Sequence, residues 1–173
     1  YACSFTERLA GNAGGSHRDT VTATVADDDG NEPSIESNEV EVAFTDVAPQ
    51  ASVVKSAAVG SVPETGGPVE FSVVVGNDGD EPFVVTSLVD SDFGDLDGRG
   101  DCVVPQTIPA GSVFGCSFTE TLSGNAGGVH RDTVTATVAD DDGNEPSVES
   151  NEVEVAFTDM MPTVLVGKSA SVA

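Results

Sequence analysis

The chain contains the same passage twice. Residues 2–59 return as residues 115–172, and only 12 of the 58 aligned positions differ. A period of about 113 residues is too long for a solenoid unit and fits one small domain, so we expect an array of whole domains. We expect residues 1–47 to be the C-terminal half of one repeat, 48–160 a complete repeat, and 161–173 the first strand of the next. This division predicts that the chain is part of something longer.

The charge of the chain is strongly negative. The chain has thirty acidic residues and only six Lys and Arg, which gives a formal net charge of −24. Such a surface repels nucleic acid and anionic membranes, so we expect neither as a partner. No apolar run approaches the roughly 18 residues of a membrane-spanning helix, and we expect no membrane insertion. The apolar residues nevertheless alternate with strand periodicity, which favours a folded chain over a disordered one.

The three cysteines fit one disulfide per repeat. Cys102 and Cys116 flank a short turn within the complete repeat. Cys3 is the repeat copy of Cys116, and its partner would lie outside the chain. A disulfide predicts an oxidising, extracellular compartment or the cell surface. The alternative is a metal–thiolate site, but the sequence has no C-x-x-C motif and no nearby His to support it.

The complete repeat contains seven segments with the composition and alternation of strands, separated by turn signals every 8–12 residues. They are 53–62, 69–76, 83–89, 102–107, 113–122, 132–139 and 152–157. No segment has a helical period. The pattern predicts an all-β fold, with tandem immunoglobulin-like antiparallel β-sandwich repeats of about 113 residues.

Several short motifs occur in a fixed order within the repeat. They are PETGG at 63–67, NDGDEP at 77–82, the Cys102/Cys116 pair, GNAGG at 124–128 followed by HRDTVTATV, DDDGN at 140–144, and NEVEVAFTD at 151–159. Together they resemble the conserved Ig-like repeat domains of large bacterial and archaeal cell-surface proteins, the domain-of-unknown-function-eleven and cell-adhesion-related type. The resemblance implies a surface location and a role in stalks, fibres or adhesive arms.

The acidic residues gather in loops, and this clustering predicts a cation site. In an antiparallel sandwich the loops 77–82 and 140–150 lie at one end, where Asp46 of the preceding repeat would arrive. The loop 90–101 and Asp159 lie at the opposite end. Clustered carboxylates repel one another unless a cation lies between them, and Ca²⁺ accepts six to eight oxygen ligands in flexible geometry. Mg²⁺ is the second choice of ion for these loops. The alternative to any cation site is that the acidic loops are solvated surface charge.

The candidate calcium ligands share an oxygen-bearing side chain in an acidic loop or at a repeat junction. They are Asp27, Asp28, Asp29, Asn31, Asp46, Asn77, Asp78, Asp80, Asp90, Asp92, Asp95, Asp97, Asp140, Asp141, Asp142, Asn144 and Asp159.

The function predicted from these features is structural. We expect an extracellular filament or stalk of tandem repeats, made rigid by calcium at acidic interdomain loops. The alternatives are an adhesive ligand-binding module of a surface adhesin, or a passive spacer that displays another domain. The partners would be neighbouring repeats or copies of the chain in a polymer, joined covalently or by strand exchange. We expect no enzymatic activity, because His17 and His130 are not accompanied by a nucleophile motif such as G-x-S-x-G.

Overall fold

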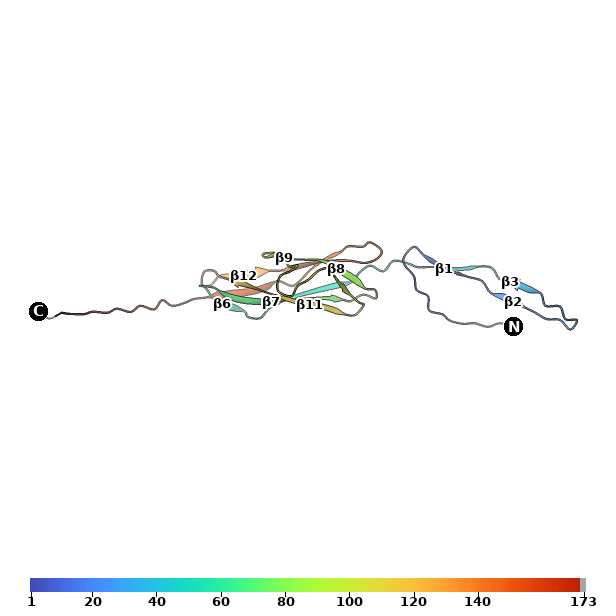
Figure 1. Cartoon of the computed structure of the whole chain (residues 1–173), viewed down its shortest axis with the longest axis horizontal. Helices are drawn as coiled ribbons and strands as arrows, with labels where there is room; N and C mark the ends of the chain where they lie inside the picture. The colour runs from blue at the N-terminus through green and yellow to red at the C-terminus, as the bar shows by residue number, and fades with distance from the viewer. Residues whose placement is uncertain (172–173) are drawn as a thin grey trace. The chain divides into compact units, whose positions relative to one another are not determined.

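A computed structural model describes residues 1–171, and all regular elements in that range are β-strands (Figure 1). The predicted all-β class is therefore confirmed. The chain forms two compact units, the first built mainly from Tyr1–Ala48 and the second mainly from the residues from Pro49 onward. Among the described residues there is no helix with the length and apolar character needed to cross a bilayer.

One layer of the second unit is a three-stranded antiparallel sheet with the order β11-β7-β5. Its strands are β5 (Ala51–Ala57), β7 (Gly67–Asn77) and β11 (Val113–Leu122). The alternation expected in the central strand is confirmed, because Val69, Phe71, Val73 and Val75 of β7 are all buried. These side chains point from one face of the sheet because successive residues of a strand alternate in direction.

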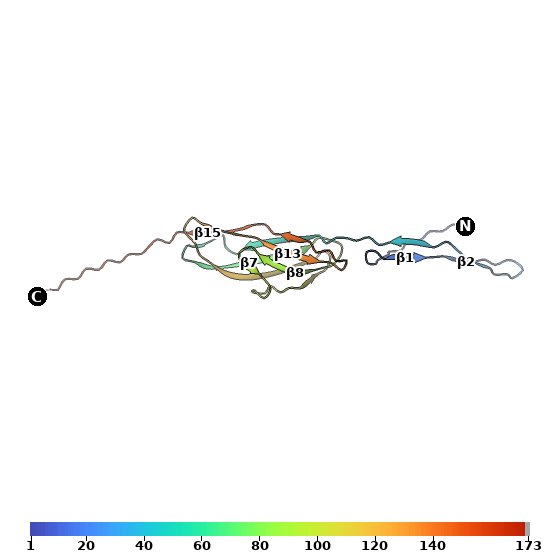
Figure 2. The same cartoon turned by 90° about the horizontal axis from the view of Figure 1, so that it is seen from above.

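The remaining strands of the second unit form further sheets (Figure 2). One has the order β10-β8-β13-β14, with β9 added to β8, and the other has the order β12-β15-β6. The strands are β6 (Ser61–Pro63), β8 (Phe83–Asp90), β9 (Gly94–Asp95), β10 (Gln106–Ile108), β12 (Val129–Asp132), β13 (Val134–Ala139), β14 (Ser147–Glu149) and β15 (Val153–Thr158). Buried side chains from these sheets join one hydrophobic core, as in a β-sandwich.

Three predicted strands differ from the observed ones, and β9 and β14 lie in segments predicted to be loops. The predicted strand 132–139 is divided, because Asp132 ends β12, which pairs with β15, whereas β13 begins at Val134 and pairs with β8. The predicted strand 53–62 is interrupted, because β5 pairs with β7 whereas β6 pairs in parallel with β15. A turn at Gly60, whose carbonyl accepts a hydrogen bond from the Ala156 amide, allows this change of partner. The predicted strand 102–107 begins only at Gln106, because Cys102 belongs to a tight loop in which its amide donates to the Arg99 carbonyl.

The predicted disulfide between Cys102 and Cys116 is confirmed. It joins the loop before β10 to the middle of β11, and both cysteines are buried. Cys3 is a free, exposed thiol, and its predicted partner outside the chain stays a prediction. Because disulfides persist in oxidising compartments, the bridge points to a non-cytoplasmic protein.

We expect loss of this disulfide to destabilise the second unit. The double substitution C102S/C116S should lower the free energy of unfolding by about 3 kcal/mol, because the bridge restricts a loop of roughly 15 residues in the unfolded chain. Urea titration of the full chain under non-reducing conditions measures this difference. The substitution C3S is the matched control and should change the unfolding free energy by less than about 0.5 kcal/mol. Equal effects of the two changes would contradict the structural role of the bridge.

The first unit repeats part of the strand pairing of the second. Its strands are β1 (Ser16–Asp19), β2 (Thr22–Thr24), β3 (Ser34–Glu36) and β4 (Val40–Ala43). Ser16 pairs with Ala43 in the first unit, and their repeat copies Val129 and Ala156 pair in the second. The surroundings nevertheless differ, since Val21 is 57% exposed whereas its copy Val134 is 0% exposed.

The C-terminal segment was predicted to be the first strand of a further repeat. Residues 159–171 contain no strand, and Val172, the end of the predicted strand 164–172, lies outside the described residues. A β-strand needs a neighbouring strand for its backbone hydrogen bonds, so the role predicted for this segment stays a prediction.

Candidate functional site

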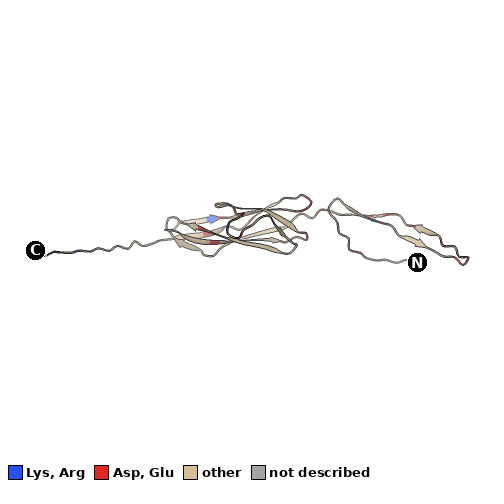
Figure 3. Ribbon diagram, viewed as in Figure 1, with Lys and Arg blue, Asp and Glu red and all other residues tan. Residues whose placement is uncertain are grey.

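Three carboxylates from two acidic loops lie close together. Glu81 comes from the loop between β7 and β8, and Asp141 and Asp142 come from the loop between β13 and β14. One carboxylate oxygen of each residue lies within 4.8 Å of the others. The sequence has thirty Asp and Glu against six Lys and Arg, and scattered red segments mark acidic residues along the ribbon (Figure 3). The group of three carboxylates suits a divalent cation, because Ca²⁺ accepts oxygen ligands from flexible loops. The loops 77–82 and 140–150 were expected to lie at one end of the sandwich, and these carboxylates meet there, although Glu81 itself was not among the named candidate ligands.

The first aspartate of each repeated DDDGN loop closes the loop. Asp140 accepts hydrogen bonds from the Asn144 amide (2.8 Å) and from the Asn144 side-chain nitrogen (2.7 Å). Asp27 accepts the same two bonds from Asn31 at the same distances. The side-chain hydrogen bond from Asn31 lowers the pKa of the Asp27 carboxyl below its ordinary value. This closure is the same in both copies and leaves the second and third aspartates of the loop exposed.

Asn77 shapes the loop that carries Glu81. Its side chain is buried, and its amide nitrogen donates to the Glu81 carbonyl (2.8 Å) and the Ile108 carbonyl (3.0 Å). Its side-chain oxygen accepts from the Gly79 amide at 3.0 Å. Asn77 therefore positions the backbone of Glu81. The neighbouring Asp78 and Asp80 lie outside the group of three carboxylates.

The loop 90–101 uses several of its carboxylates to fold itself. Asp95 accepts a hydrogen bond from the Asp97 amide, and Asp97 accepts one from the Val104 amide, both at 3.0 Å. Within residues 1–171, no group of three carboxylates close enough to share an ion is found in this loop. Asp46 and Asp159, predicted at the repeat junctions, are exposed, and their role at a junction stays a prediction.

A buried cluster of charged side chains forms a second site. Lys55 Nζ of β5 lies 2.6 Å from Asp90 Oδ2 at the end of β8 and 2.5 Å from Asp132 Oδ2 at the end of β12. All three side chains are 0% exposed. Asp90, a candidate calcium ligand in the sequence, is thus the partner of an ammonium group. Asp90 is therefore not available to a metal ion in this arrangement, whereas Asp92 Oδ2 lies 3.4 Å from His130 Nδ1 and its predicted role as a calcium ligand stays a prediction.

Aromatic rings enclose the ammonium group of this cluster. Lys55 Nζ lies 4.5 Å from the ring centre of Phe71, 5.7 Å from that of Phe93 and 5.8 Å from that of Phe118. These distances allow cation–π attraction to a desolvated ammonium. The Phe71 and Phe118 rings stack on each other, with centres 5.5 Å apart. The rings therefore both hold the cation and separate it from water.

The two carboxylates of the cluster have different surroundings. Asp90 Oδ1 accepts hydrogen bonds from the amides of Asp92 (3.0 Å) and Phe93 (3.2 Å). Asp132 Oδ2 lies 3.0 Å from His130 Nε2, whereas Asp132 Oδ1 is buried without a hydrogen-bond partner among the described residues. This cluster was not predicted from the sequence. The available signal was a Lys at an inward-facing position of a strand, two residues after the buried Val53.

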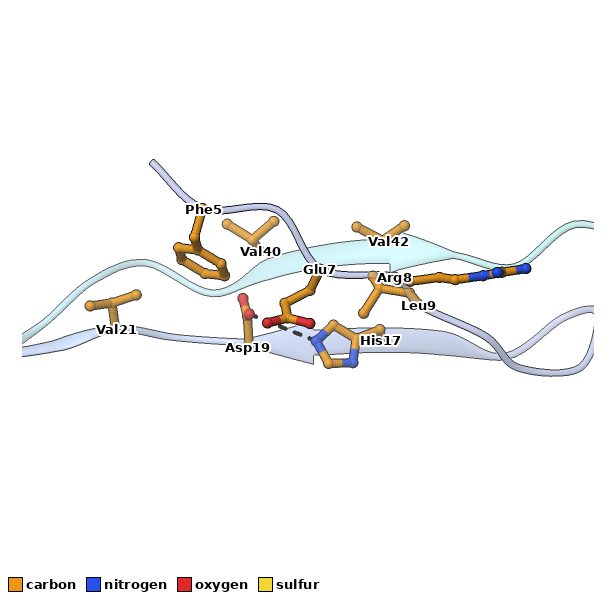
Figure 4. Close-up of a pocket in the computed structure, with 9 residues that line it drawn as sticks. All are labelled: Phe5, Glu7, Arg8, Leu9, His17, Asp19, Val21, Val40 and Val42. Carbon is orange, nitrogen blue, oxygen red and sulfur yellow. Dashed lines mark ion pairs between the residues drawn. The ribbon is translucent and has the colours of Figure 1, made fainter. Parts of the chain in front are cut away.

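The first unit contains a groove of about 790 Å³ on its β1–β4 hairpin (Figure 4). Side chains on its wall include Phe5, Leu9, His17, Asp19 and Val21. The repeat copies of these residues are Phe118, Leu122, His130, Asp132 and Val134. In the second unit all these copies except the partly buried His130 are buried. The residues that line the groove are therefore copies of residues that pack in the core of the second unit. This correspondence explains why the lining is largely apolar.

Comparisons with known proteins do not identify a family. No protein-family model matches the chain, and no curated protein matches it significantly. Among solved structures, the structural-genomics target SoR45 has 14% identity and a TM-score of 0.43, and the match covers 72% of this chain and 96% of that one. A Bordetella pertussis protein described as a putative ApaA protein has 20% identity and a TM-score of 0.43, with 64% and 94% covered. Likenesses of this degree indicate neither a family nor a function.

Proposed function

We propose that this chain is part of an extracellular structural filament or stalk. In this proposal it consists of tandem immunoglobulin-like β-sandwich repeats, made rigid by calcium at acidic interdomain loops. The near-identity of residues 2–59 and 115–172 supports an array of equivalent modules. The matched registers of the β1–β4 and β12–β15 pairs support the same conclusion. The Cys102–Cys116 disulfide supports an oxidising location.

The observation that carries the calcium part of the proposal is the group formed by Glu81, Asp141 and Asp142. Three carboxylates in loops give a site with high negative charge and flexible geometry. Ca²⁺ tolerates this geometry and completes its shell with waters and backbone carbonyls, whereas Mg²⁺ demands a near-ideal octahedron. The group holds no Cys or His, so its donor atoms do not favour Zn²⁺ or Cu²⁺.

The identity of the repeated acidic loops favours a structural role over a ligand-binding one. Residues 27–34 and 140–147 have the same sequence, DDDGNEPS. Loops that recognise a specific partner are the places where a repeat protein varies its sequence, whereas a joint needs the same residues each time. We therefore rank the adhesive ligand-binding module and the passive spacer below the structural role as proposed functions.

Calcium binding is testable with a variant pair that the repeat itself supplies. Calcium at about 100 times its dissociation constant should stabilise the folded chain by about 2.7 kcal/mol, because the ion binds the folded state only. Thermal unfolding of the full chain in calcium and in chelator, at low salt, measures this shift. The variant D141N/D142N should lose the shift, because it removes two of the three clustered carboxylates.

The control for this experiment is D28N/D29N, which changes the same two positions in the other copy of the loop. It removes the same charge but leaves the group of Glu81, Asp141 and Asp142 intact. We expect it to keep the calcium-dependent shift. If chelator leaves the unfolding temperature unchanged, or if both variants behave alike, the calcium site is refuted.

A further inference from the structure

We propose that Lys55 and Asp132 become joined by an intramolecular amide bond, with Asp90 as the proton acceptor of the reaction. Lys55 Nζ lies 2.5 Å from Asp132 Oδ2, in a site from which solvent is excluded. The reacting groups therefore already touch, which removes the entropic barrier that two separate reactants would face. This inference concerns the core of the second unit and does not depend on calcium or on a polymer.

The cluster is poorly balanced as a simple ion pair. One ammonium faces two buried carboxylates, and burying charged groups costs free energy that only well-matched partners offset. Asp132 Oδ1 is buried without a hydrogen-bond partner among the described residues, which adds a desolvation penalty. Condensation of Lys55 with Asp132 removes one positive and one negative charge from the core. The reaction also removes one of the two carboxylate oxygens of Asp132, which leaves as part of the water.

The step balances without any further reactant. The ammonium of Lys55 transfers a proton to the Asp90 carboxylate, which leaves a neutral amine. Nζ then forms a bond to Cγ of Asp132, and one C–O bond of Asp132 breaks. Nζ loses two of its three protons in total, and both leave with the departing oxygen as water. Asp90 gives the proton that it accepted to the departing oxygen and ends as a carboxylate. The net charge of the cluster is therefore the same before and after the reaction.

The surroundings assign different roles to the two aspartates. Two backbone amides hold Asp90 Oδ1, which fixes this carboxylate with Oδ2 at 2.6 Å from the ammonium, in place to accept a proton. Asp132 has no such donors on Oδ1 in the described part of the chain, so its carboxyl group is restrained through Oδ2, by Lys55 and His130. The rings of Phe71 and Phe118 exclude the water that would favour ionised groups and reverse the condensation.

The product would tie the first strand of the unit to a strand late in its sequence. Lys55 belongs to β5, in the β11-β7-β5 sheet, and Asp132 belongs to β12, in the β12-β15-β6 sheet. A covalent bond between these sheets prevents the strands from separating even when the chain is pulled. The repeat copies of the two residues are Lys168 and Asp19, and both are exposed in this chain. We therefore expect one cross-link and not two.

Intact mass spectrometry of the full chain, reduced and denatured, tests the bond directly. We expect the mass calculated from the sequence less the mass of one water. Trypsin cleaves after Arg18, Arg99 and Arg131 but not after a Lys whose amine is acylated. Digestion should therefore give a species that joins the peptide 19–99 to the peptide that contains Asp132. The unmodified mass, with separate peptides 19–55 and 56–99, would overturn the proposal.

Digestion also tests which aspartate reacts. A bond to Asp90 would give a single peptide 19–99 that lacks one water, and this result would overturn the assignment to Asp132. The variants K55M and D132A should both show the full calculated mass. The variant D90N should accumulate the unlinked form, because it removes the proton acceptor but keeps the size of the side chain. K168M should retain the loss of one water, and a full mass for this variant would contradict the assignment to Lys55.

Discussion

The substitution K55A should destabilise the second unit by at least about 3–5 kcal/mol. It leaves the buried carboxylates of Asp90 and Asp132 without their partner, and an uncompensated buried charge costs about this much. It also removes a side chain that fills the space over the Phe71 ring. Urea unfolding of the full chain, followed by a signal from the second unit, measures the loss.

Lys168 provides the matched control for this prediction. It is the repeat copy of Lys55 and is followed by the same two residues, but it is exposed. The substitution K168A should change the free energy of unfolding by less than about 0.5 kcal/mol. A loss below about 1 kcal/mol for K55A, or similar losses for both variants, would show that the buried cluster contributes little to stability.

The substitution F118A should also destabilise the second unit by about 3–5 kcal/mol, because removing a buried aromatic ring loses its transfer free energy and leaves a cavity. Phe118 is 2% exposed and packs against Phe71 and Phe93. The surrounding strands fill such a cavity only in part. The substitution also removes the cation–π contact between the Phe118 ring and the Lys55 ammonium, so we expect part of the loss to come from that contact.

The repeat again supplies the control, because Phe5 is the copy of Phe118 and has the same residues on either side. Phe5 is 75% exposed, so F5A should change the free energy of unfolding by less than about 0.5 kcal/mol. Measuring both variants in the full chain separates the effect of burial from the effect of sequence. Equal losses would mean that Phe5 is buried in solution, and the groove of the first unit would then have an occupant.

The two candidate sites act on different parts of the proposed filament. The carboxylates of Glu81, Asp141 and Asp142 lie in loops, where a bound ion would stiffen the backbone. The cluster of Lys55, Asp90 and Asp132 lies in the core, where a covalent bond would resist separation of the sheets. The disulfide restrains a third segment, the loop before β10. Each responds to a different treatment, namely chelation, substitution of Lys55 and reduction, so their contributions are separable.

Much of the fold was predictable because the alternation of apolar and polar residues indicates a strand from a short segment of sequence. The alternation of Val69, Phe71, Val73 and Val75 indicated an inward face, and these four residues are buried. The spacing of Cys102 and Cys116 indicated a disulfide, which is present. The change of sheet between β5 and β6 was not predictable, because β6 pairs with β15, a strand from the far end of the unit's sequence.

The candidate sites were predicted less well than the fold. The list of acidic residues could not distinguish Asp140, which closes its own loop, from Asp141 and Asp142, which meet Glu81. It also placed Asp90 with the calcium ligands, although this residue faces Lys55 in the core. An Asp looks the same in the sequence whether it accepts a backbone amide, pairs with an ammonium or faces solvent. Only its three-dimensional neighbours separate these roles.

The sequence alone determined that the chain is all-β, that it contains one long passage twice and that it carries a large negative charge. These properties depend on residue type and on spacing along one chain, which the sequence records directly. The tertiary structure decided which identical residues are buried and which are exposed, as Asp132 and Val134 show beside Asp19 and Val21. It also brought Lys55 to Asp90 and Asp132, because contacts between strands distant in sequence form only when the sheets pack around a common core.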